Sequence, residues 1–400
     1  MPRLPLLLLA SVLALPATAG AVQVFDKPIP ERKISRLHLS VGGFVQPRFT
    51  LIQQDEDAGF EGELGFEVRR VRLEIQGGID VPLANQPFNL EIDHKMSVEL
   101  MPEPRLQDGW FEIGLGSFLR LRMGQQKTPT SRSLLVSDKN TMFPERAHID
   151  TLSPRRDMGV QFHGTIGEGK FIEYGVGVFN GEGRNRLSNV NRKFLYAARL
   201  AVSPLGTPGT NKEVLSPKDG WRCNKEPDKH AFTFTLGYAW HFNQIGPPGA
   251  EEAFMGHNVE LFAHYRWVNL QSEFLYVVTD FEDKTLVDFN TYGWYVQLAL
   301  FPPMVPWVQD HFAFVFRVEE YDEFMQTFHS DDDVPIALAG PTDPAQKQRN
   351  VAFGLTFYSG SPLFLGIGDL RIQAIYSVNT EAEDQPYRND MFQLAAHLTI

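Results

Sequence analysis

The sequence of 400 residues contains a single cysteine, Cys223, so it lacks the material for a disulfide. One cysteine also cannot build a cysteine-based zinc site. After the first 21 residues, no stretch approaches the roughly 20 consecutive apolar residues of a membrane-spanning helix. No Pro/Ser-rich linker or abrupt change of composition divides residues 22–400, which we expect to form one domain. We expect no cofactor, no metal site and no nucleic-acid partner.

The amino-terminal segment has the three parts of an export signal. Arg3 precedes an apolar run from Leu4 to Leu15, and small residues follow up to Ala19 and Ala21. A basic start, a short apolar centre and small residues before the cleavage point are typical of secretory signal peptides. Residues 1–21 are therefore predicted to be a signal peptide, cleaved after Ala19 or Ala21.

The composition combines a polar average with many aromatic side chains. The mean hydropathy is −0.22, yet the chain holds 31 Phe, 11 Tyr and 6 Trp. Strands of a membrane β-barrel give this combination, because they alternate apolar and polar residues and carry aromatic girdles.

Alternation with a period of two runs through the chain. Between residues 231 and 243 every even position is aromatic or leucine, and the odd positions are small or polar. Such alternation predicts a β-strand with one apolar face. The same rule predicts about sixteen strands, near residues 37–51, 65–77, 87–99, 107–115, 117–126, 157–167, 170–179, 193–203, 230–243, 257–268, 269–280, 290–301, 310–321, 349–358, 368–378 and 390–400.

These strands predict an all-β protein, a transmembrane antiparallel β-barrel in the outer membrane of a Gram-negative bacterium. An even number of antiparallel strands can close a barrel and leave no backbone edge in lipid. A barrel of this size is wide enough to hold water. A periplasmic β-sandwich is the soluble alternative, but one core could not bury aromatic faces on nearly every strand.

The predicted connections differ in length. Val268-Asn269-Leu270 is predicted to be a short turn, whereas 127–156, 204–229, 244–256 and 322–348 are long. The segment 204–229, which is rich in Gly, Pro, Lys and Asp, is expected to be an exposed loop. Asp331-Asp332-Asp333 lacks the spacing of a calcium loop, so it is expected to be solvated surface.

Charge is distributed unevenly along the chain. The formal net charge is −12, but residues 22–202 carry +1 and residues 203–400 carry −14. Segment 120–156 holds eight Lys or Arg and three acids. Because local charge at a constriction decides selectivity, the net charge is a poor guide to the permeant ion.

Strand parity divides the charged residues between lipid and lumen. Arg70 and Arg72 alternate with outward-facing aliphatic residues and are predicted to face the lumen, as are Arg120, Arg122, Glu91 and Asp93. Arg69 is at an odd position, like the outward-facing Val71 and Leu73. Before it, however, the apolar residues Phe66 and Val68 are at even positions, so the alternation changes phase. A β-bulge near Arg69-Arg70 would reconcile the two phases.

A series of motifs between residues 40 and 202 resembles the phosphate-selective porin O and P family. The motifs are Gly43-Phe44-Val45-Gln46-Pro47-Arg48, Phe66-Glu67-Val68-Arg69-Arg70-Val71-Arg72-Leu73, Leu90-Glu91-Ile92-Asp93, Asp108-Gly109-Trp110, Arg122-Met123-Gly124-Gln125-Gln126-Lys127, Glu145-Arg146, Arg155-Arg156-Asp157-Met158-Gly159-Val160-Gln161 and Tyr174-Gly175-Val176-Gly177-Val178-Phe179-Asn180-Gly181.

The resemblance implies a homotrimer of sixteen-stranded barrels, each narrowed by an inward-folded loop, for which 127–156 is the candidate. It implies an anion site formed by Arg69, Arg70 and Lys127. Asp93 matches an acidic wall residue of the family, and Thr130 and Ser131 fall near its hydroxyl contacts. Guanidinium and ammonium groups complement phosphate oxygens, and hydroxyls add hydrogen bonds.

The sequence thus predicts a passive channel for small anions such as phosphate, and not an enzyme. A general or cation-preferring porin remains an alternative. A barrel enzyme would need a serine or aspartate placed beside one of the lumen or strand-end histidines, His163, His241, His264 or His311. An adhesin or receptor that uses the acidic loops is a third possibility.

Overall fold

The fold is known from a computed structural model of the chain. It describes residues 22–29, 34–53, 62–83, 89–167, 171–206, 213–214, 232–247, 251–282, 289–303, 305–322, 347–359, 369–380 and 390–399. The predicted signal peptide and the triplet at 331–333 lie outside the described residues.

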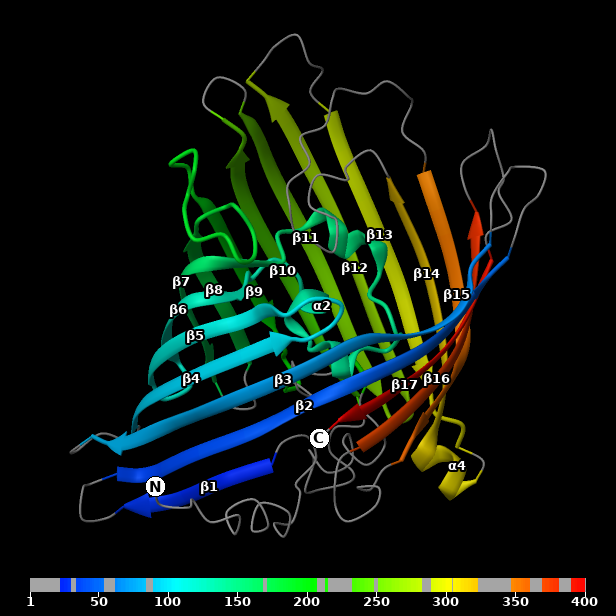
Figure 1. The fold of residues 1–400 in the computed structure, drawn as a ribbon, viewed down its shortest axis with the longest axis horizontal. Helices are drawn as coiled ribbons and strands as arrows, with labels where there is room; N and C mark the ends of the chain where they lie inside the picture. The colour runs from blue at the N-terminus through cyan, green and yellow to red at the C-terminus, as the bar shows by residue number, and fades with distance from the viewer. Residues whose placement is uncertain are drawn as a thin grey trace, which may run out of the picture.

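Seventeen strands form one antiparallel sheet (Figure 1). Their bounds are β1 Val22–Ile29, β2 Ile34–Ile52, β3 Leu64–Pro82, β4 Asn89–Glu99, β5 Arg105–Leu115, β6 Leu119–Lys127, β7 Arg156–Ile166, β8 Ile172–Phe179, β9 Leu195–Val202, β10 Phe232–Ile245, β11 Glu252–Tyr265, β12 Val268–Phe281, β13 Phe289–Leu300, β14 Phe312–Asp322, β15 Lys347–Tyr358, β16 Asp369–Thr380 and β17 Met391–Thr399.

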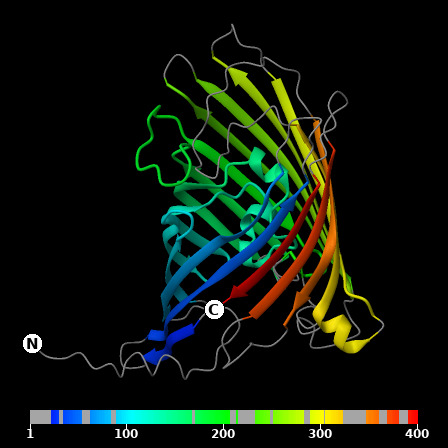
Figure 2. The same cartoon turned by 45° about the vertical axis from the view of Figure 1, so that its right-hand side comes forward.

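The sheet closes on itself, because the last strand pairs with the second. Each of β2 to β16 pairs with the next strand in the sequence, and β17 pairs with β2 over Phe44–Ile52. The result is a closed barrel of sixteen strands, β2 to β17. β1 pairs with the earlier part of β2, Ile34–Val41. β1 and β17 therefore lie one after the other along the same edge of β2. Figures 1 and 2 show this seam at the front of the barrel.

The predicted architecture is confirmed, since each of the sixteen segments expected from alternation overlaps one strand of the barrel. Two details differ. β1 was not predicted, because its alternation is short and soon reaches Pro28. The turn predicted at Val268-Asn269-Leu270 is instead Arg266–Trp267, since β11 and β12 pair as far as Tyr265 and Val268. Arg266 has φ of 50°, the left-handed conformation that a two-residue hairpin needs.

The two faces of each strand have different surroundings, as the alternation requires. Outward side chains form an exposed apolar belt that includes Phe111, Phe162, Leu236, Val259 and Phe314. Inward positions are mostly buried, and many of them are polar, such as Gln46, Asn258 and Gln271. Apart from the strands, none of the helices in the described ranges is long and apolar enough to cross a membrane.

The segment between β6 and β7, residues 128–155, lies inside the barrel (Figures 1 and 2). We call it the constriction loop. It contains α2 Arg132–Leu135 and two short 3-10 helices, η3 Asp138–Asn140 and η4 His148–Leu152. Gly124, shortly before it in β6, has φ of +120°, and a Cβ there would lie 2.3 Å from the carbonyl oxygen of Gly109. Only glycine fits this close approach of β5 and β6.

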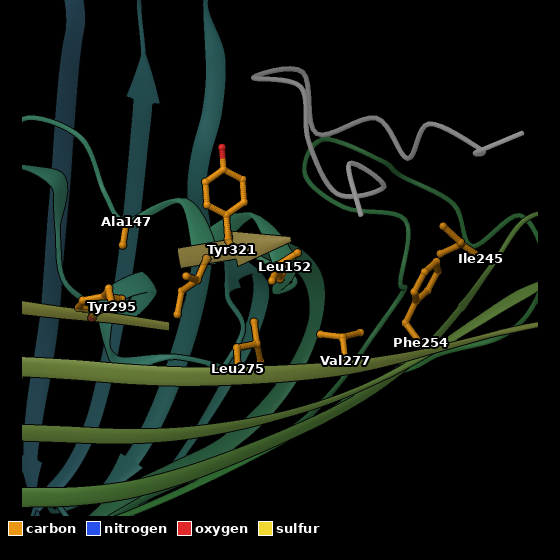
Figure 3. Close-up of a cluster of buried hydrophobic side chains, with 9 residues drawn as sticks. Ala147, Leu152, Ile245, Phe254, Leu275, Val277, Tyr295 and Tyr321 are labelled. Atoms are coloured by element: carbon orange, nitrogen blue, oxygen red, sulfur yellow. The ribbon is translucent and has the colours of Figure 1, made fainter. Parts of the chain in front are cut away.

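The constriction loop leans on the wall formed by β10 to β16. Ala147, Ile149 and Leu152 pack against a buried cluster on this wall: Ile245, Phe254, Leu275, Val277, Tyr295 and Tyr321 (Figure 3). Met142 and Phe143 enter a second cluster around Phe301 and Ile375. Burying an aliphatic side chain of this size contributes about 1.5–3 kcal/mol, so the loop has an apolar attachment to one side of the lumen.

Candidate functional site

Carboxylates of the β10–β16 wall accept hydrogen bonds from the main chain of the constriction loop. Glu260 of β11 accepts from the Arg132 amide at 2.9 Å, and Glu273 of β12 accepts from the Ser133 amide at 2.8 Å. Glu319 of β14 accepts from the His148 amide at 2.8 Å. All three glutamates are at most 1% exposed. These three acids of the second half of the chain are therefore used to hold the loop.

Wall donors bind the carbonyl groups of the same loop. They are Asn258 to Thr130, Arg371 to Thr141, Gln373 to Met142 and Arg317 to Glu145, and Gln46 of β2 on the opposite wall adds a bond to Pro144. Buried backbone groups must be paired, and here wall side chains pair them. The wall thus contacts the main chain of the loop along most of its length.

The β9–β10 connection also reaches the loop at Glu213 and Val214, and there the expectation that 204–229 is exposed is wrong. The structure describes residues 203–206 and 213–214 of this connection. Leu205 is 40% exposed as expected, but Glu213 and Val214 are only 3% and 8% exposed. The Glu213 carboxylate accepts from the Met142 amide at 2.6 Å and from Gln297 at 3.0 Å. Its polar composition predicted a surface loop, but the lumen of a barrel is itself polar.

On the opposite wall, three arginines converge on one carboxylate of the loop. Glu145 Oε1 accepts from Arg48 Nη1 at 2.6 Å and from Arg69 Nε at 2.9 Å, and Oε2 accepts from Arg70 Nη2 at 2.8 Å. Burial alone would raise the pKa of Glu145, but the charges of Arg70, Arg69 and Arg48 lower it to about 2. Glu145 is therefore ionised at any physiological pH.

Arg69 reaches this group because of the predicted β-bulge. The register of β2 and β3 shifts between Gln46 and Pro47, which pair with Arg70 and Val68, so the register skips Arg69. A bulged residue lets the strand change phase. Phe66 and Leu73, on the two sides of the bulge, accordingly both face outward.

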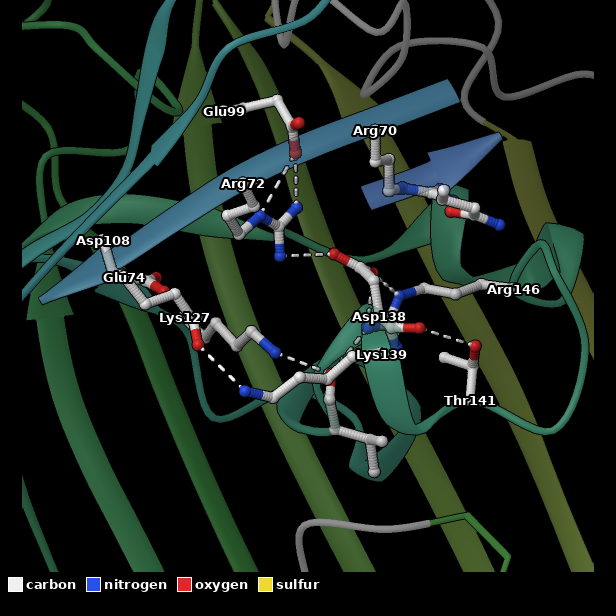
Figure 4. A network of polar contacts seen from close by, with 12 residues as sticks. Arg70, Arg72, Glu74, Glu99, Asp108, Lys127, Asp138, Lys139, Thr141 and Arg146 are labelled. Atoms are coloured by element: carbon white, nitrogen blue, oxygen red, sulfur yellow. Dashed lines mark hydrogen bonds and ion pairs between the residues drawn. The ribbon is translucent and has the colours of Figure 1, made fainter. Parts of the chain in front are cut away.

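Arg72 lies at the centre of a network of polar contacts between β3 and the constriction loop (Figure 4). It lies 2.9 Å from Glu99 and 2.7 Å from Asp138 of η3, and Arg146 lies 2.8 Å from the same aspartate. Nearby, Lys139 of the loop lies 3.0 Å from Glu74 of β3. Ion pairs between β3 and the loop therefore bridge the lumen.

Two cavities lie on either side of this bridge, and both are lined by more cations than anions. The loop-side cavity, of about 610 Å³, is lined by ten arginines and five carboxylates. The turn-side cavity, of about 640 Å³, extends toward the short turn at Ser117 and is lined by eight Lys or Arg and four carboxylates. Arg72 and Arg156 line both cavities, so they lie where the two meet.

The structure brings together only part of the predicted anion site. Arg69 and Arg70 line the loop-side cavity, whereas Lys127 lines the turn-side cavity and donates to the Leu135 and Val136 carbonyls at 3.1 and 2.7 Å. Thr130 and Ser131 line neither cavity. Thr130 donates to the Pro154 carbonyl, and Ser131 donates to Glu273 and caps α2.

The remaining predicted residues lie nearer the short turns. Arg120 pairs with Glu91, Asp93 and Glu112, and Arg122 pairs with Glu112 and stacks on Trp110 at 4.1 Å. Both arginines line the turn-side cavity. Asp93 belongs to this ion-pair group, away from the clustered arginines at Glu145.

Sequence reasoning missed Arg48, Glu145 and Arg156 as residues of the site. All three belong to motifs quoted for the family resemblance. Arg48 follows Pro47, where the register of β2 and β3 shifts, so strand parity alone could not show that its side chain faces the lumen. Glu145 lies 97 residues from Arg48 in sequence, and only the inward path of the loop brings them together.

Residues 45–307 match the profile of the family described as phosphate-selective porin O and P. The chain belongs to this family. The match extends beyond residue 202, where the recognisable motifs end, and covers strands β10 to β13. The protein is thus an outer-membrane porin, a channel protein by family and by fold. No curated protein sequence matches the chain significantly.

Solved porin structures share the fold of this porin. The anion-selective porin from Comamonas acidovorans has a TM-score of 0.56 at 10% identity, covering 90% of this chain and 99% of that one. OmpT of Vibrio cholerae, in its trimer form, has 0.55 at 12% identity, covering 90% and 99%. The outer-membrane channel DcaP of Acinetobacter baumannii has 0.52 at 11% identity, covering 91% and 97%.

Three of the four histidines considered for a barrel enzyme contact other groups in this porin. His163 contacts Glu112 at 2.7 Å, His264 contacts Asn269 at 3.1 Å, and His311 contacts the Trp307 carbonyl within α4 Pro306–His311. His241 is buried. Within the part of the chain that the structure describes, no three His, Cys, Asp or Glu side chains are grouped to hold a metal.

Proposed function

We propose that this porin is a passive channel that conducts small anions, phosphate among them, in preference to cations. The observation that carries the proposal is the excess of basic over acidic side chains around both cavities, ten against five and eight against four. Fixed positive charge along a narrow aqueous path raises the local concentration of anions and lowers that of cations.

The net charge of −12 does not oppose this proposal. Glu260, Glu273 and Glu319 are sealed between the wall and the constriction loop, where they accept hydrogen bonds from the loop. Acids on exposed loops act weakly on the constriction, because charges more than about 8–10 Å away are screened at physiological salt. The cations around the cavities therefore dominate the path of the ion.

The reversal potential of single channels in a potassium chloride gradient tests this proposal. Anion preference predicts a reversal potential of the sign set by chloride, and added phosphate is expected to reduce the chloride current. A potential of the sign set by potassium would reject the anion preference and leave a general porin.

A homotrimer is the assembly we propose. Strands β6, β8 and β9 are 8 or 9 residues long, whereas β10, β11 and β12 have 14. The short side still exposes apolar residues such as Met123, Phe162 and Val176, which neighbouring subunits would cover. Native mass measurement in gentle detergents tests the trimer, and monomers alone at about micromolar concentration would reject it.

We further propose that residues 1–21 are removed on export. Mass spectrometry of protein purified from outer membranes would give the new amino terminus. A terminus at Gly20 or Val22 would agree with the signal-peptide pattern, and retained Met1 would contradict it.

A further inference from the structure

Arg48, Arg69 and Arg70 hold the carboxylate of Glu145 in the way that a binding site holds a ligand. We call these three residues the arginine clasp. Arg48 and Arg69 donate to one oxygen of Glu145, and Arg70 donates to the other. Such charge-assisted bonds to both oxygens are the usual means by which arginine recognises a planar carboxylate.

The clasp can be reached from the lumen. The side chain of Glu145 is 31% exposed, and those of Arg69 and Arg70 are 23% and 12% exposed. All of them line the loop-side cavity of about 610 Å³. That volume is within the range of small-molecule sites, about 300–1,000 Å³, and far exceeds the needs of a single chloride.

The cavity next to the clasp also has an apolar part. Its lining includes the partly exposed Met101 and Met391 together with the arginines, and the buried Phe143 and Ile375 lie behind them. Inorganic anions gain nothing from such side chains, whereas the hydrocarbon part of an organic acid can contact them. The combination favours an organic anion with one carboxylate and an apolar body.

We infer that the arginine clasp is a binding site for organic carboxylates and that Glu145 is a built-in competitor for it. The inference rests on the proposed anion channel and deepens it. An entering carboxylate replaces the Glu145 side chain on the clasp, and the return of Glu145 then releases it. The loop backbone keeps its place during the exchange, because Gln46, Arg70 and Arg317 bind the carbonyls of Pro144 and Glu145.

A tethered competitor suits a channel. Conduction requires a site that attracts the solute and also releases it quickly. A group attached nearby acts at an effective concentration of millimolar or more, so it weakens the apparent affinity of every free carboxylate. Three arginines without Glu145 would hold an organic anion longer and slow its passage.

The test is block of chloride current by benzoate in planar bilayers, with Glu145→Gln compared with wild type. Removing the charge of the competitor is expected to lower the half-blocking benzoate concentration by at least about tenfold. Glu67→Gln is the matched control. Glu67 contacts Arg48 at 2.6 Å but has a side chain that is 44% exposed. We expect this control to change the value by about twofold at most, as for other exposed ion pairs.

Other outcomes would overturn the inference. Unchanged or weaker benzoate block in Glu145→Gln would mean that Glu145 is no competitor. An equal gain for phosphate would mean that the clasp does not select organic carboxylates. If Glu145→Gln does not fold into heat-modifiable barrels, Arg69→Gln in the otherwise wild-type channel serves instead and should weaken benzoate block several-fold, while unchanged block would reject the site.

The reversal potential of the wild-type channel distinguishes a failure of this inference from a failure of the proposed function. If the wild-type channel prefers cations but Glu145→Gln is blocked by a lower benzoate concentration, the proposed anion channel is rejected and the inference about the clasp stands. Anion preference without that gain would reject only the clasp.

Discussion

The β2–β7 wall and the β10–β16 wall both present titratable side chains to the constriction loop, but the first presents arginines and the second glutamates, and their exposure differs. Arg48, Arg69 and Arg70 of the first wall keep 12–23% of their side-chain surface open to the lumen. Glu260, Glu273 and Glu319 of the second wall are at most 1% exposed. The difference indicates that one wall faces the permeant ion while the other anchors the loop. Net charge alone could not distinguish these two uses.

The largest expected effect comes from breaking the anchor at Glu273. Its carboxylate accepts hydrogen bonds from Ser131, Ser133, Asn258 and Tyr295 at 2.6–2.8 Å. Glu273→Ala leaves these buried donors unpaired, at about 1–3 kcal/mol each before relaxation. We expect the loop to detach and single-channel conductance to rise severalfold. Glu282→Ala, at an exposed position just beyond the end of the same strand, should leave conductance unchanged. Equal conductance in both variants would refute the anchoring role.

A substitution at Lys127 tests whether this side chain holds the loop or binds the permeant anion. Its ammonium group donates to two loop carbonyls, so Lys127→Met should loosen the start of the loop by about 1.5–3 kcal/mol. We expect noisier open-channel current and a small change in reversal potential. A large loss of anion preference with steady current would instead assign Lys127 directly to the path of the anion.

Arg70 tests the basic wall itself. Arg70→Ala removes one cation from the loop-side cavity, and we expect the anion-to-cation permeability ratio to fall by up to about tenfold, or 1.4 kcal/mol. Arg36→Ala is the control, since Arg36 pairs with Asp26 at an exposed position between β1 and β2. Reversal potentials that are the same in both variants would mean that the basic wall does not set selectivity.

The smallest expected effect is a pH dependence of the loop at His148. Burial disfavours the imidazolium, but the Glu319 carboxylate 3.0 Å away outweighs burial and raises the pKa of His148 above its ordinary value of 6.5. Because the attached state has the higher pKa, this contact stabilises the loop fully below about pH 6.5 and is lost as pH rises through the raised pKa. The contribution is about 1 kcal/mol or less, since the imidazole is 45% exposed.

Open-channel noise recorded from about pH 6 to 9 measures this dependence. We expect the noise of the wild type to increase with pH and that of His148→Gln to stay constant. A wild-type channel that is quieter at high pH would contradict the sign of the predicted effect.

Features that depend on local alternation were predictable from the sequence, and those that depend on distant contacts were not. Alternation located all sixteen barrel strands, and a phase change at Arg69 located the bulge. The contact between Ser131 and Glu273 joins residues 142 positions apart, and no local pattern indicates it. The family resemblance implied that Thr130 and Ser131 lie near the anion, whereas their hydroxyls make the anchoring contacts with Pro154 and Glu273.

The β10–β16 wall and the β9–β10 connection bind many backbone groups of the constriction loop, and this has a consequence for how such channels can change. The amides of Arg132, Ser133, Met142 and His148 and the carbonyls that accept from wall donors are present whatever side chains the loop carries. Substitutions at lumen-facing positions of the loop can therefore alter the preferred solute while its position is kept. Solute preference can evolve separately from barrel architecture, and the same division offers a route to redesigning the pore.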